Sequence, residues 1–229
     1  MNATETRSIT SAVQYRAADK GPGALGGYAL KFERYSQNLG GFVEQVARGA
    51  VDKTIADAVD VLCRYQHDDN HLLGRTASGT LVLTRDDTGL LYDVPALPDT
   101  TSGRDVAELC RRGDVTGSSF AFRTLEDDWG FTDQGFPLRT LVQIRLLDVA
   151  PVVSPAYLDT SSAVRSLAEA IHATPEDVPA LAERGEIAAR LRKPTVIDLN
   201  AGDGGQRATH PPTSVLLQLV ELERKRTTL

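Results

Sequence analysis

A serine, a histidine and an aspartate in this sequence have the chemistry of a nucleophilic triad. Ser119 lies in the run Gly-Ser-Ser-Phe-Ala-Phe, His67 ends one β-prone stretch, and Asp148 lies near the end of another. A serine hydroxyl is a weak nucleophile near neutral pH, so it needs an imidazole to take its proton and a carboxylate to orient that imidazole. With 4 histidines and 31 acidic residues in the chain, many such triplets exist, and the residue types alone do not establish an enzyme.

His67 is expected at the end of a buried strand face. The apolar residues of the stretch 59–67 fall on its odd positions, which are Val59, Val61, Cys63 and Tyr65. Alternate side chains of a strand share a face, so His67 continues the apolar face and is held firmly at its end. The alternative is an imidazole at the edge of the core that only hydrogen-bonds a neighbour.

Asp148 is expected on a buried face of a second strand. The run 138–149 is β-prone, and its even positions include Val142, Ile144 and Leu146. A carboxylate among such neighbours is costly unless it accepts hydrogen bonds, for example from an imidazole N–H. The alternative is an aspartate that caps a turn or helix at the strand end.

Two neighbouring residues compete for roles in this arrangement. The hydroxyls of Ser118 and Ser119 point to opposite faces of a strand, so only one of them can face His67. His67 and His71 have the spacing of two metal ligands on a helix. The intervening Asp-Asp-Asn favours a turn, and no third ligand is apparent, so we expect neither a metal nor another cofactor.

The composition bounds the class of protein. A length of 229 residues with 41% hydrophobic residues indicates one sizeable domain with tails. A net charge of −6 argues against a nucleic-acid partner, and no apolar run is long enough for a membrane span. Only two cysteines are present, Cys63 and Cys110, and we expect buried free thiols in a reducing cytosol.

The first part of the chain reads as a leader followed by strands. Residues 1–24 are polar without a sustained period, which indicates a flexible leader. A first strand is expected at 27–34, where apolar and polar residues alternate. The pattern Asp-Asp-Thr-Gly within 79–94 predicts a hairpin with the glycine at a positive φ.

The second part mixes helices with one more pair of strands. A short helix is expected at 106–112, capped by Ser102 or Asp105 and ended by Gly113. The polar segment 125–135, which contains the lone tryptophan, indicates a surface loop. Trp129 is expected to pack inward; the alternative is that it grips the substrate. Helical patterns follow at 163–172 and 177–192, then a flexible linker at 193–213 and a last amphipathic helix at 214–225. The helix pair is not basic, so DNA binding is discounted.

Five motifs together resemble the prohead serine protease family of tailed phages, which is distantly similar to the herpesvirus assemblins. They are Tyr-Gln-His-Asp-Asp-Asn-His-Leu-Leu-Gly-Arg at 65–75, Asp-Asp-Thr-Gly-Leu at 86–90, Leu-Pro-Asp-Thr at 97–100, Arg-Gly-Asp-Val-Thr-Gly-Ser-Ser-Phe-Ala-Phe at 112–122 and Leu-Asp-Val-Ala-Pro-Val-Val-Ser-Pro-Ala at 147–156. The motifs occur in the same order and with the same spacing as in the family, and the resemblance covers about residues 25–165.

The resemblance implies a fold and a division of the chain. The expected fold is mainly β with flanking helices (α+β), a closed antiparallel β-barrel of the assemblin type. A protease domain is expected over 25–162, after a leader over 1–24. Residues 163–229 are expected to form a helical C-terminal region with a flexible linker.

The resemblance also implies roles for single residues. The catalytic serine of the family directly precedes Phe-x-Phe, which selects Ser119 as the nucleophile, with His67 as its general base. Asp148 is the expected third member, although the family commonly has Glu there, so the shorter side chain must approach more closely or act through water. Assemblins use a second histidine in that role, and His71 is the substitute candidate; otherwise it faces solvent or the rim of the substrate groove.

The implied function is maturation of a phage capsid. The expected enzyme is a serine endopeptidase that cleaves the scaffold or the scaffolding region of the major capsid protein, and also itself. It acts inside the immature prohead in the host cytoplasm, self-associates, and has no nucleic-acid or membrane partner. The alternatives are a non-catalytic, protease-like scaffold or capsid-assembly protein and, less favoured, an esterase with the same triad.

Overall fold

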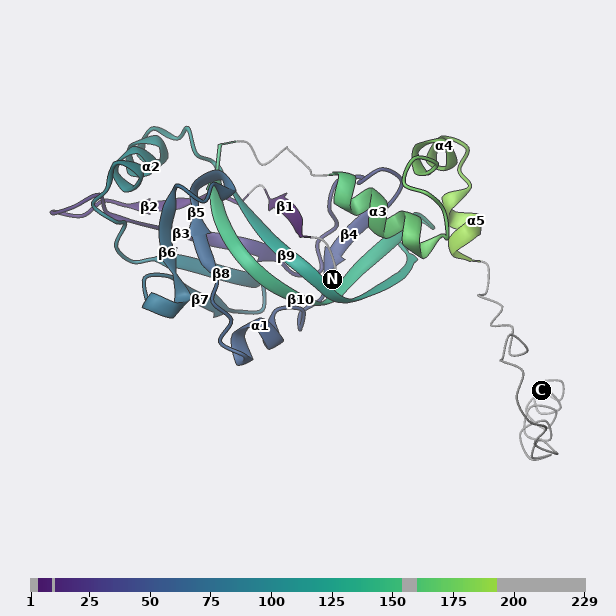
Figure 1. Cartoon of the computed structure of the whole chain (residues 1–229), viewed down its shortest axis with the longest axis horizontal. Coiled ribbons are helices and arrows are strands. Elements are labelled where there is room, and N and C mark those ends of the chain that lie inside the picture. The colour runs from purple at the N-terminus through teal and green to yellow at the C-terminus, as the bar shows by residue number, and fades with distance from the viewer. Residues whose placement is uncertain (1–3, 10, 154–159, 193–229) are drawn as a thin grey trace, which may run out of the picture. The chain divides into compact units, whose positions relative to one another are not determined.

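The computed structural model describes residues 4–9, 11–153 and 160–192. They belong to one compact unit spanning residues 1–193, in which ten strands and five α-helices are assigned (Figure 1). The linker expected over 193–213 and the helix expected over 214–225 lie outside the described residues. In the part of the chain that is described, no helix is both long and apolar enough to cross a membrane.

The larger of two sheets carries the residues expected to do chemistry. Its order is β1 (Glu5–Ile9), β9 (Gly117–Phe131), β10 (Pro137–Val152), β5 (Leu62–Arg64) and β6 (Leu72–Arg75), with β4 (Val43–Val46) also paired to β10. β9 and β10 form a long antiparallel hairpin. The other edge of β10 pairs in parallel with β4 at 138–141 and with β5 at 148–149. β10 therefore brings β5 and β9 close together.

The smaller sheet is antiparallel throughout. Its order is β2 (Gln14–Arg16), β3 (Ala24–Lys31), β8 (Gly89–Val94) and β7 (Val82–Arg85). β7 and β8 form the hairpin that the sequence predicts, but Gly89 is needed for another reason than a positive φ. A Cβ atom at Gly89 would lie 2.1 Å from the carbonyl oxygen of Leu30, so the close approach of two backbones requires the glycine.

Both sheets enclose one hydrophobic core. Leu30 and Tyr92 reach it from the smaller sheet, and Phe122 and Ile144 from the larger one, each at most 1% exposed. Burial of this apolar surface is the main driving force for the fold. The mainly β architecture with helices is thus confirmed. The pairings among the described strands form two sheets, and the closed ring of strands stays a prediction.

Helices flank the sheets and bury a second apolar cluster. They are α1 (Asp52–Ala56), α2 (Thr101–Arg112), α3 (Thr160–Ala170), α4 (Val178–Glu183) and α5 (Ile187–Leu191). Leu167 and Leu181 pack with Phe42, and Phe42 contacts the ring of Trp129 at a centroid distance of 5.0 Å. Trp129 therefore packs inward, as expected. α3–α5 belong to the same compact unit as the sheets, so no break between compact units falls at the expected boundary of 162.

The prediction of a flexible leader over residues 1–24 is wrong for the described part of that range. β1 and β2 lie within it, and β1 pairs with β9 from Glu5↔Phe122 to Ile9↔Ser118. Glu5 and Arg7 are each only 4% exposed. The sequence pattern misses this strand because its buried side chains are charged, and ion pairs satisfy them in place of apolar contacts.

Two element boundaries also differ from expectation. β9 continues to Phe131 because pairing with β10 holds the polar segment in a strand, so the surface loop shrinks to 132–136. Helix α2 begins at Thr101 because Thr100 caps it, accepting a hydrogen bond from the Gly103 N–H at 3.3 Å. Gly113 ends it with a φ of 81°, as predicted.

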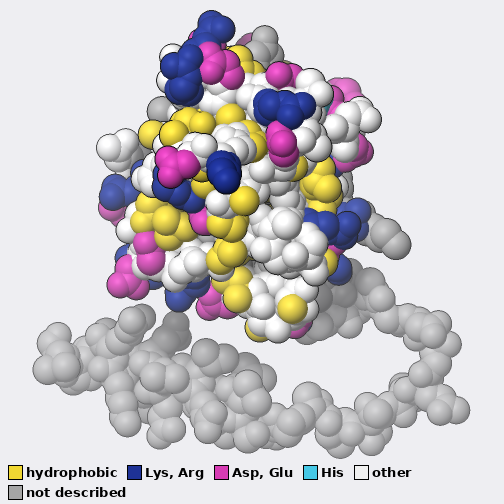
Figure 2. Space-filling view, turned by 90° about the vertical axis from the view of Figure 1, so that its left-hand side faces the viewer, with side chains coloured by type: hydrophobic (Ala, Val, Ile, Leu, Met, Phe, Trp, Pro, Cys, Tyr) yellow, Lys and Arg dark blue, Asp and Glu magenta, His cyan; other side chains and the backbone are white. Residues whose placement is uncertain are grey.

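The surface is charged without segregation on the face that Figure 2 shows. Basic and acidic side chains are interspersed there with hydrophobic ones, and neither sign gathers into a continuous patch on that face.

Candidate active site

His67 reaches the site through a tight turn, not along a continuous strand. β5 ends at Arg64, and Tyr65–His67 form a short 3-10 turn. Gln66 and His67 both have left-handed backbones, with φ of 57° and 59°, a conformation that is unfavourable for residues other than glycine. A backbone hydrogen bond of 3.0 Å from the Tyr65 N–H to the His71 carbonyl helps to hold the turn. The strand predicted over 59–67 is therefore confirmed only at its centre.

Ser119 lies on β9 with its side chain fully buried. Its register partner on β1 is Ser8. The adjacent Ser118 hydroxyl contacts the Tyr92 hydroxyl at 3.1 Å, on the opposite face of the strand. Strand alternation thus separates the two serines, and it is Ser119 that faces His67.

Asp148 is fully buried on β10, at the position where that strand pairs with Leu62 of β5. Its two carboxylate oxygens have different partners: Oδ1 contacts His67 Nδ1, and Oδ2 pairs with the Arg64 guanidinium. A carboxylate in a dry interior requires such partners, because an unpaired charge there is very costly. Despite its shorter side chain, the aspartate contacts the imidazole directly.

The three side chains form one continuous series of contacts. His67 Nε2 lies 2.7 Å from Ser119 Oγ, while Nδ1 contacts the Asp148 carboxylate. When Nδ1–H donates to that carboxylate, Nε2 carries the lone pair and can accept a proton from the hydroxyl. The arrangement can therefore deprotonate an alcohol and hold the resulting imidazolium.

Most of the chain matches a known family. The model of the caudovirus prohead serine proteases matches residues 11–174, which is more than half of the chain and includes all three side chains. The chain belongs to the caudovirus prohead serine protease family. No curated protein matches it. Among solved structures, the bacteriophage T4 capsid assembly protease is similar, with a TM-score of 0.45 and 13% identity over 67% of this chain and 100% of that chain.

The imidazole of His67 is kept neutral by its surroundings. Burial, and next the positive charge of Arg64, lower the pKa of His67 to about 4. Desolvation disfavours the charged imidazolium, and a nearby cation repels it. At pH 7 the ring is therefore unprotonated and ready to accept a proton.

Sequence reasoning missed one residue of the candidate site, Arg64. It occupies an even position of the stretch 59–67, so strand alternation pointed it away from the face of His67. Because the strand ends there and the chain turns, its guanidinium reaches Asp148 and also pairs with the exposed Asp69. The available signal was chemical: a carboxylate predicted among apolar residues needs more than one partner.

His71 does not take part in the series of contacts. Its Nδ1 lies 2.8 Å from the Ser102 hydroxyl, and its Nε2 lies 3.9 Å from the Asp68 carboxylate. The side chain is 43% exposed, in agreement with the expected position facing solvent or the groove rim. Within the described residues, no group of His, Cys, Asp and Glu side chains has the arrangement of a metal site.

Proposed function

We propose that this chain is the serine endopeptidase that matures a phage prohead, with Ser119 as nucleophile and His67 as general base. Asp148 orients the imidazole. The supporting observation is that His67 contacts the other two side chains through its two ring nitrogens, in a chain that belongs to a serine protease family. Arg64 positions Asp148 through the second carboxylate oxygen.

The proposed reaction is hydrolysis in two steps. Ser119 Oγ attacks the carbonyl carbon of the peptide bond while its proton passes to His67 Nε2. The C–N bond then breaks as His67 gives that proton to the leaving amine, which leaves the acyl group esterified to Ser119. A water molecule, deprotonated by His67, attacks the ester, releases the carboxylic acid product and restores the serine. Asp148 accepts the Nδ1–H hydrogen bond throughout and stabilises the imidazolium.

The proposed substrates follow from the family. They are the scaffold or the scaffolding region of the major capsid protein, together with this chain itself, inside the immature prohead in the host cytoplasm. Self-association of the active form is part of the proposal. So is closure of the two sheets into an assemblin-like barrel, which their single shared core favours.

The test is to follow the intact masses of the chain and of co-expressed major capsid protein and scaffold over time. With the wild-type chain, we expect these masses to decrease in discrete steps. With Ser119→Ala, we expect all of them to remain constant, because no nucleophile is left to form the ester.

Ser118→Ala is the matched control, since its hydroxyl lies next in sequence but on the opposite face. If cleavage is lost in Ser118→Ala and kept in Ser119→Ala, the assignment of Ser119 as the nucleophile is wrong. If the wild-type chain leaves itself, the capsid protein and the scaffold uncleaved, the alternative of a non-catalytic assembly protein is favoured.

A further inference from the structure

The strand β1 lies directly against the proposed nucleophile. It pairs antiparallel with residues 118–122 of β9, and Ser8 stands opposite Ser119. The Arg7 carbonyl oxygen accepts a hydrogen bond from Ser119 Oγ at 2.9 Å, and the Ser8 hydroxyl donates to the same Oγ at 3.1 Å. Ser119 is consequently 0% exposed. A substrate strand that paired with β9 beside Ser119 would have to replace β1.

The Arg7 carbonyl of β1 competes with His67 for the proton of the Ser119 hydroxyl. A serine has a single hydroxyl proton, so it can donate to the Arg7 carbonyl or to His67 Nε2, but not to both. Attack requires the second of these. The present arrangement, an extended strand with a carbonyl group at the nucleophile, is how a peptide substrate would lie if it added to the edge of β9.

The Arg7 side chain is held by an acid from a distant strand. Its Nε and Nη2 donate to the two oxygens of Glu44 at 2.9 and 3.1 Å, and its guanidinium lies 5.6 Å from the centre of the Phe122 ring. Glu44, on β4, is only 4% exposed. The family match begins at residue 11, so Glu44 belongs to the matched part of the chain and Arg7 does not.

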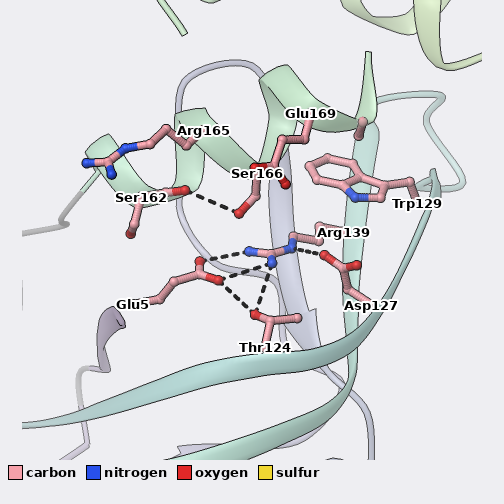
Figure 3. A pocket seen from close by; sticks show the side chains of 10 residues that line it. Glu5, Thr124, Asp127, Trp129, Arg139, Ser162, Arg165, Ser166 and Glu169 are labelled. Atoms are coloured by element: carbon pink, nitrogen blue, oxygen red, sulfur yellow. Dashed lines mark hydrogen bonds and ion pairs between the residues drawn. The ribbon is translucent and has the colours of Figure 1, made fainter. Parts of the chain in front are cut away.

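The charges around Glu44 stay partly compensated when β1 is taken away. Figure 3 shows Arg139 between Glu5, Thr124 and Asp127. Arg139 also pairs with Glu44 at 3.0 Å. Since Glu5 and Arg7 carry opposite charges, their departure leaves two carboxylates around one guanidinium. That excess negative charge favours a cationic side chain in the place of Arg7.

The position of β1 at the edge of the sheet makes its replacement feasible. It is the end strand, paired with β9 alone among the described strands. A cavity of about 280 Å³ adjoins it, with Ser8 and Glu44 among the lining residues. Displacing β1 therefore breaks one ladder and one set of ion pairs, not a second ladder.

We propose that β1 occupies the peptide-binding groove of the protease, and that this groove binds an extended peptide carrying an arginine or lysine, whose side chain Glu44 holds. The cationic residue is the one whose carbonyl faces Ser119. This inference rests on the proposed function, because it takes Ser119 as the nucleophile.

The test measures peptide binding without cleavage. The protein is the full chain carrying Ser119→Ala, together with Arg7→Gln to weaken β1. The probes are fluorescent peptides with the sequence of residues 4–12, in which the position of Arg7 holds Arg, Lys, Gln or Glu. We expect the Arg and Lys peptides to bind about tenfold or more tightly than the Gln peptide, and the Glu peptide most weakly. Fluorescence anisotropy gives the dissociation constants.

A second protein variant identifies the residue responsible for this preference. Adding Glu44→Gln should make the Arg and Gln peptides bind equally, as in a double-mutant cycle. Glu33→Gln is the matched control, since Glu33 is an exposed acid that pairs with Arg48, and the preference should persist. Equal binding of the four peptides, or a preference that survives Glu44→Gln, overturns the inference. The peptide series also tests it with Glu44 intact, should Glu44→Gln fold poorly.

The same peptides separate this inference from the proposed function. They are incubated with the Arg7→Gln chain that retains Ser119, and cleavage is followed by mass spectrometry. Selective binding without cleavage would leave the groove assignment standing and remove the protease assignment. Cleavage without preference for Arg or Lys would keep the protease and overturn the role of Glu44.

Discussion

The β9–β10 hairpin carries two groups of buried charges that differ in what they can do. One joins Asp148 to His67 and Arg64 at the proposed active site. The other, here called the charged cluster, consists of Arg7, Arg139, Glu5, Glu44 and Asp127. The first group contains a neutral imidazole that can accept a proton from the neighbouring hydroxyl, whereas the charged cluster contains only carboxylates and guanidinium groups.

Opposing effects on the pKa explain this difference. In the charged cluster, burial would raise the pKa of Glu5, but Arg139 outweighs it and the pKa is lowered. Burial would likewise lower the pKa of Arg139, but Glu5 and Glu44 raise it. In the active site, burial and Arg64 act together on His67 and keep it neutral. Close pairing thus keeps the groups of the charged cluster ionised, whereas burial and a neighbouring cation keep the imidazole neutral and able to accept a proton.

The largest expected effect is that of removing the imidazole. His67→Ala should reduce kcat/KM for a cleaved peptide about 10⁴-fold or more, because Ser119 then loses its general base. The stability of the fold should change little by comparison. His71→Ala is the control, since that imidazole lies outside the series of contacts and should retain activity. Full activity in His67→Ala would contradict the proposal that these three residues form a catalytic triad.

The next largest effect is expected from changing Asp148, the third member of the proposed triad. Asp148→Asn keeps the size of the side chain but can donate to Nδ1, which favours the wrong tautomer of His67. We expect kcat to fall about 10³–10⁴-fold, with KM changed much less. Steady-state kinetics measures both parameters. Asp99→Asn, at an exposed acid paired with Arg104, should have no effect, and an equal loss there would point to a nonspecific cause.

Breaking the charged cluster should affect stability. Arg139→Leu leaves the carboxylates of Glu5, Glu44 and Asp127 without their shared cation, which should lower the free energy of unfolding by about 3–5 kcal/mol. Urea denaturation gives the value. Arg111→Leu removes the exposed pair with Glu108 and should change the free energy of unfolding far less, because solvent screens exposed charges. Similar losses in both variants would contradict the distinction between buried and exposed pairs.

The smallest effect is a shift in pH dependence. The wild-type kcat/KM should hold as the pH falls below 6 and decline through about pH 4, where His67 becomes protonated. Arg64→Met removes the cation that disfavours imidazolium and leaves Asp148 to stabilise it. The pKa of His67 then rises towards its ordinary value, and the acid limb of the profile should move to higher pH. An unmoved acid limb would show that Arg64 does not act on His67.

The sequence predicted the parts of this molecule in which apolar alternation or a motif carries the information. The runs around Ser119 and Asp148 are such parts, and the three side chains assigned to the triad do lie in contact. Their catalytic roles remain proposals. The hairpin at 86–88 and the end of helix α2 at Gly113 could also be predicted from the sequence, because turn-forming residues occur at both places.

The features that escaped prediction are those that depend on partners far away in the sequence. β1 reads as a polar leader because Glu5 and Arg7 are buried only through Glu44 and Arg139. The left-handed turn at Gln66 has no glycine to signal it. No local pattern reports such features, since the energy that stabilises them comes from tertiary contacts.

The pairing of β10 with strands on both of its edges fixes the order in which the molecule can be assembled during translation. Residues 137–152 form the last strand among the described residues, so the pairings of β4, β5 and β9 with β10 can form only after those residues have been made. His67 and Asp148 are separated by 81 positions, which ribosomes cover in about 4–16 s. Throughout that interval the nascent polypeptide lacks its carboxylate partner for the imidazole. Late synthesis of β10 thus delays the contact between His67 and Asp148.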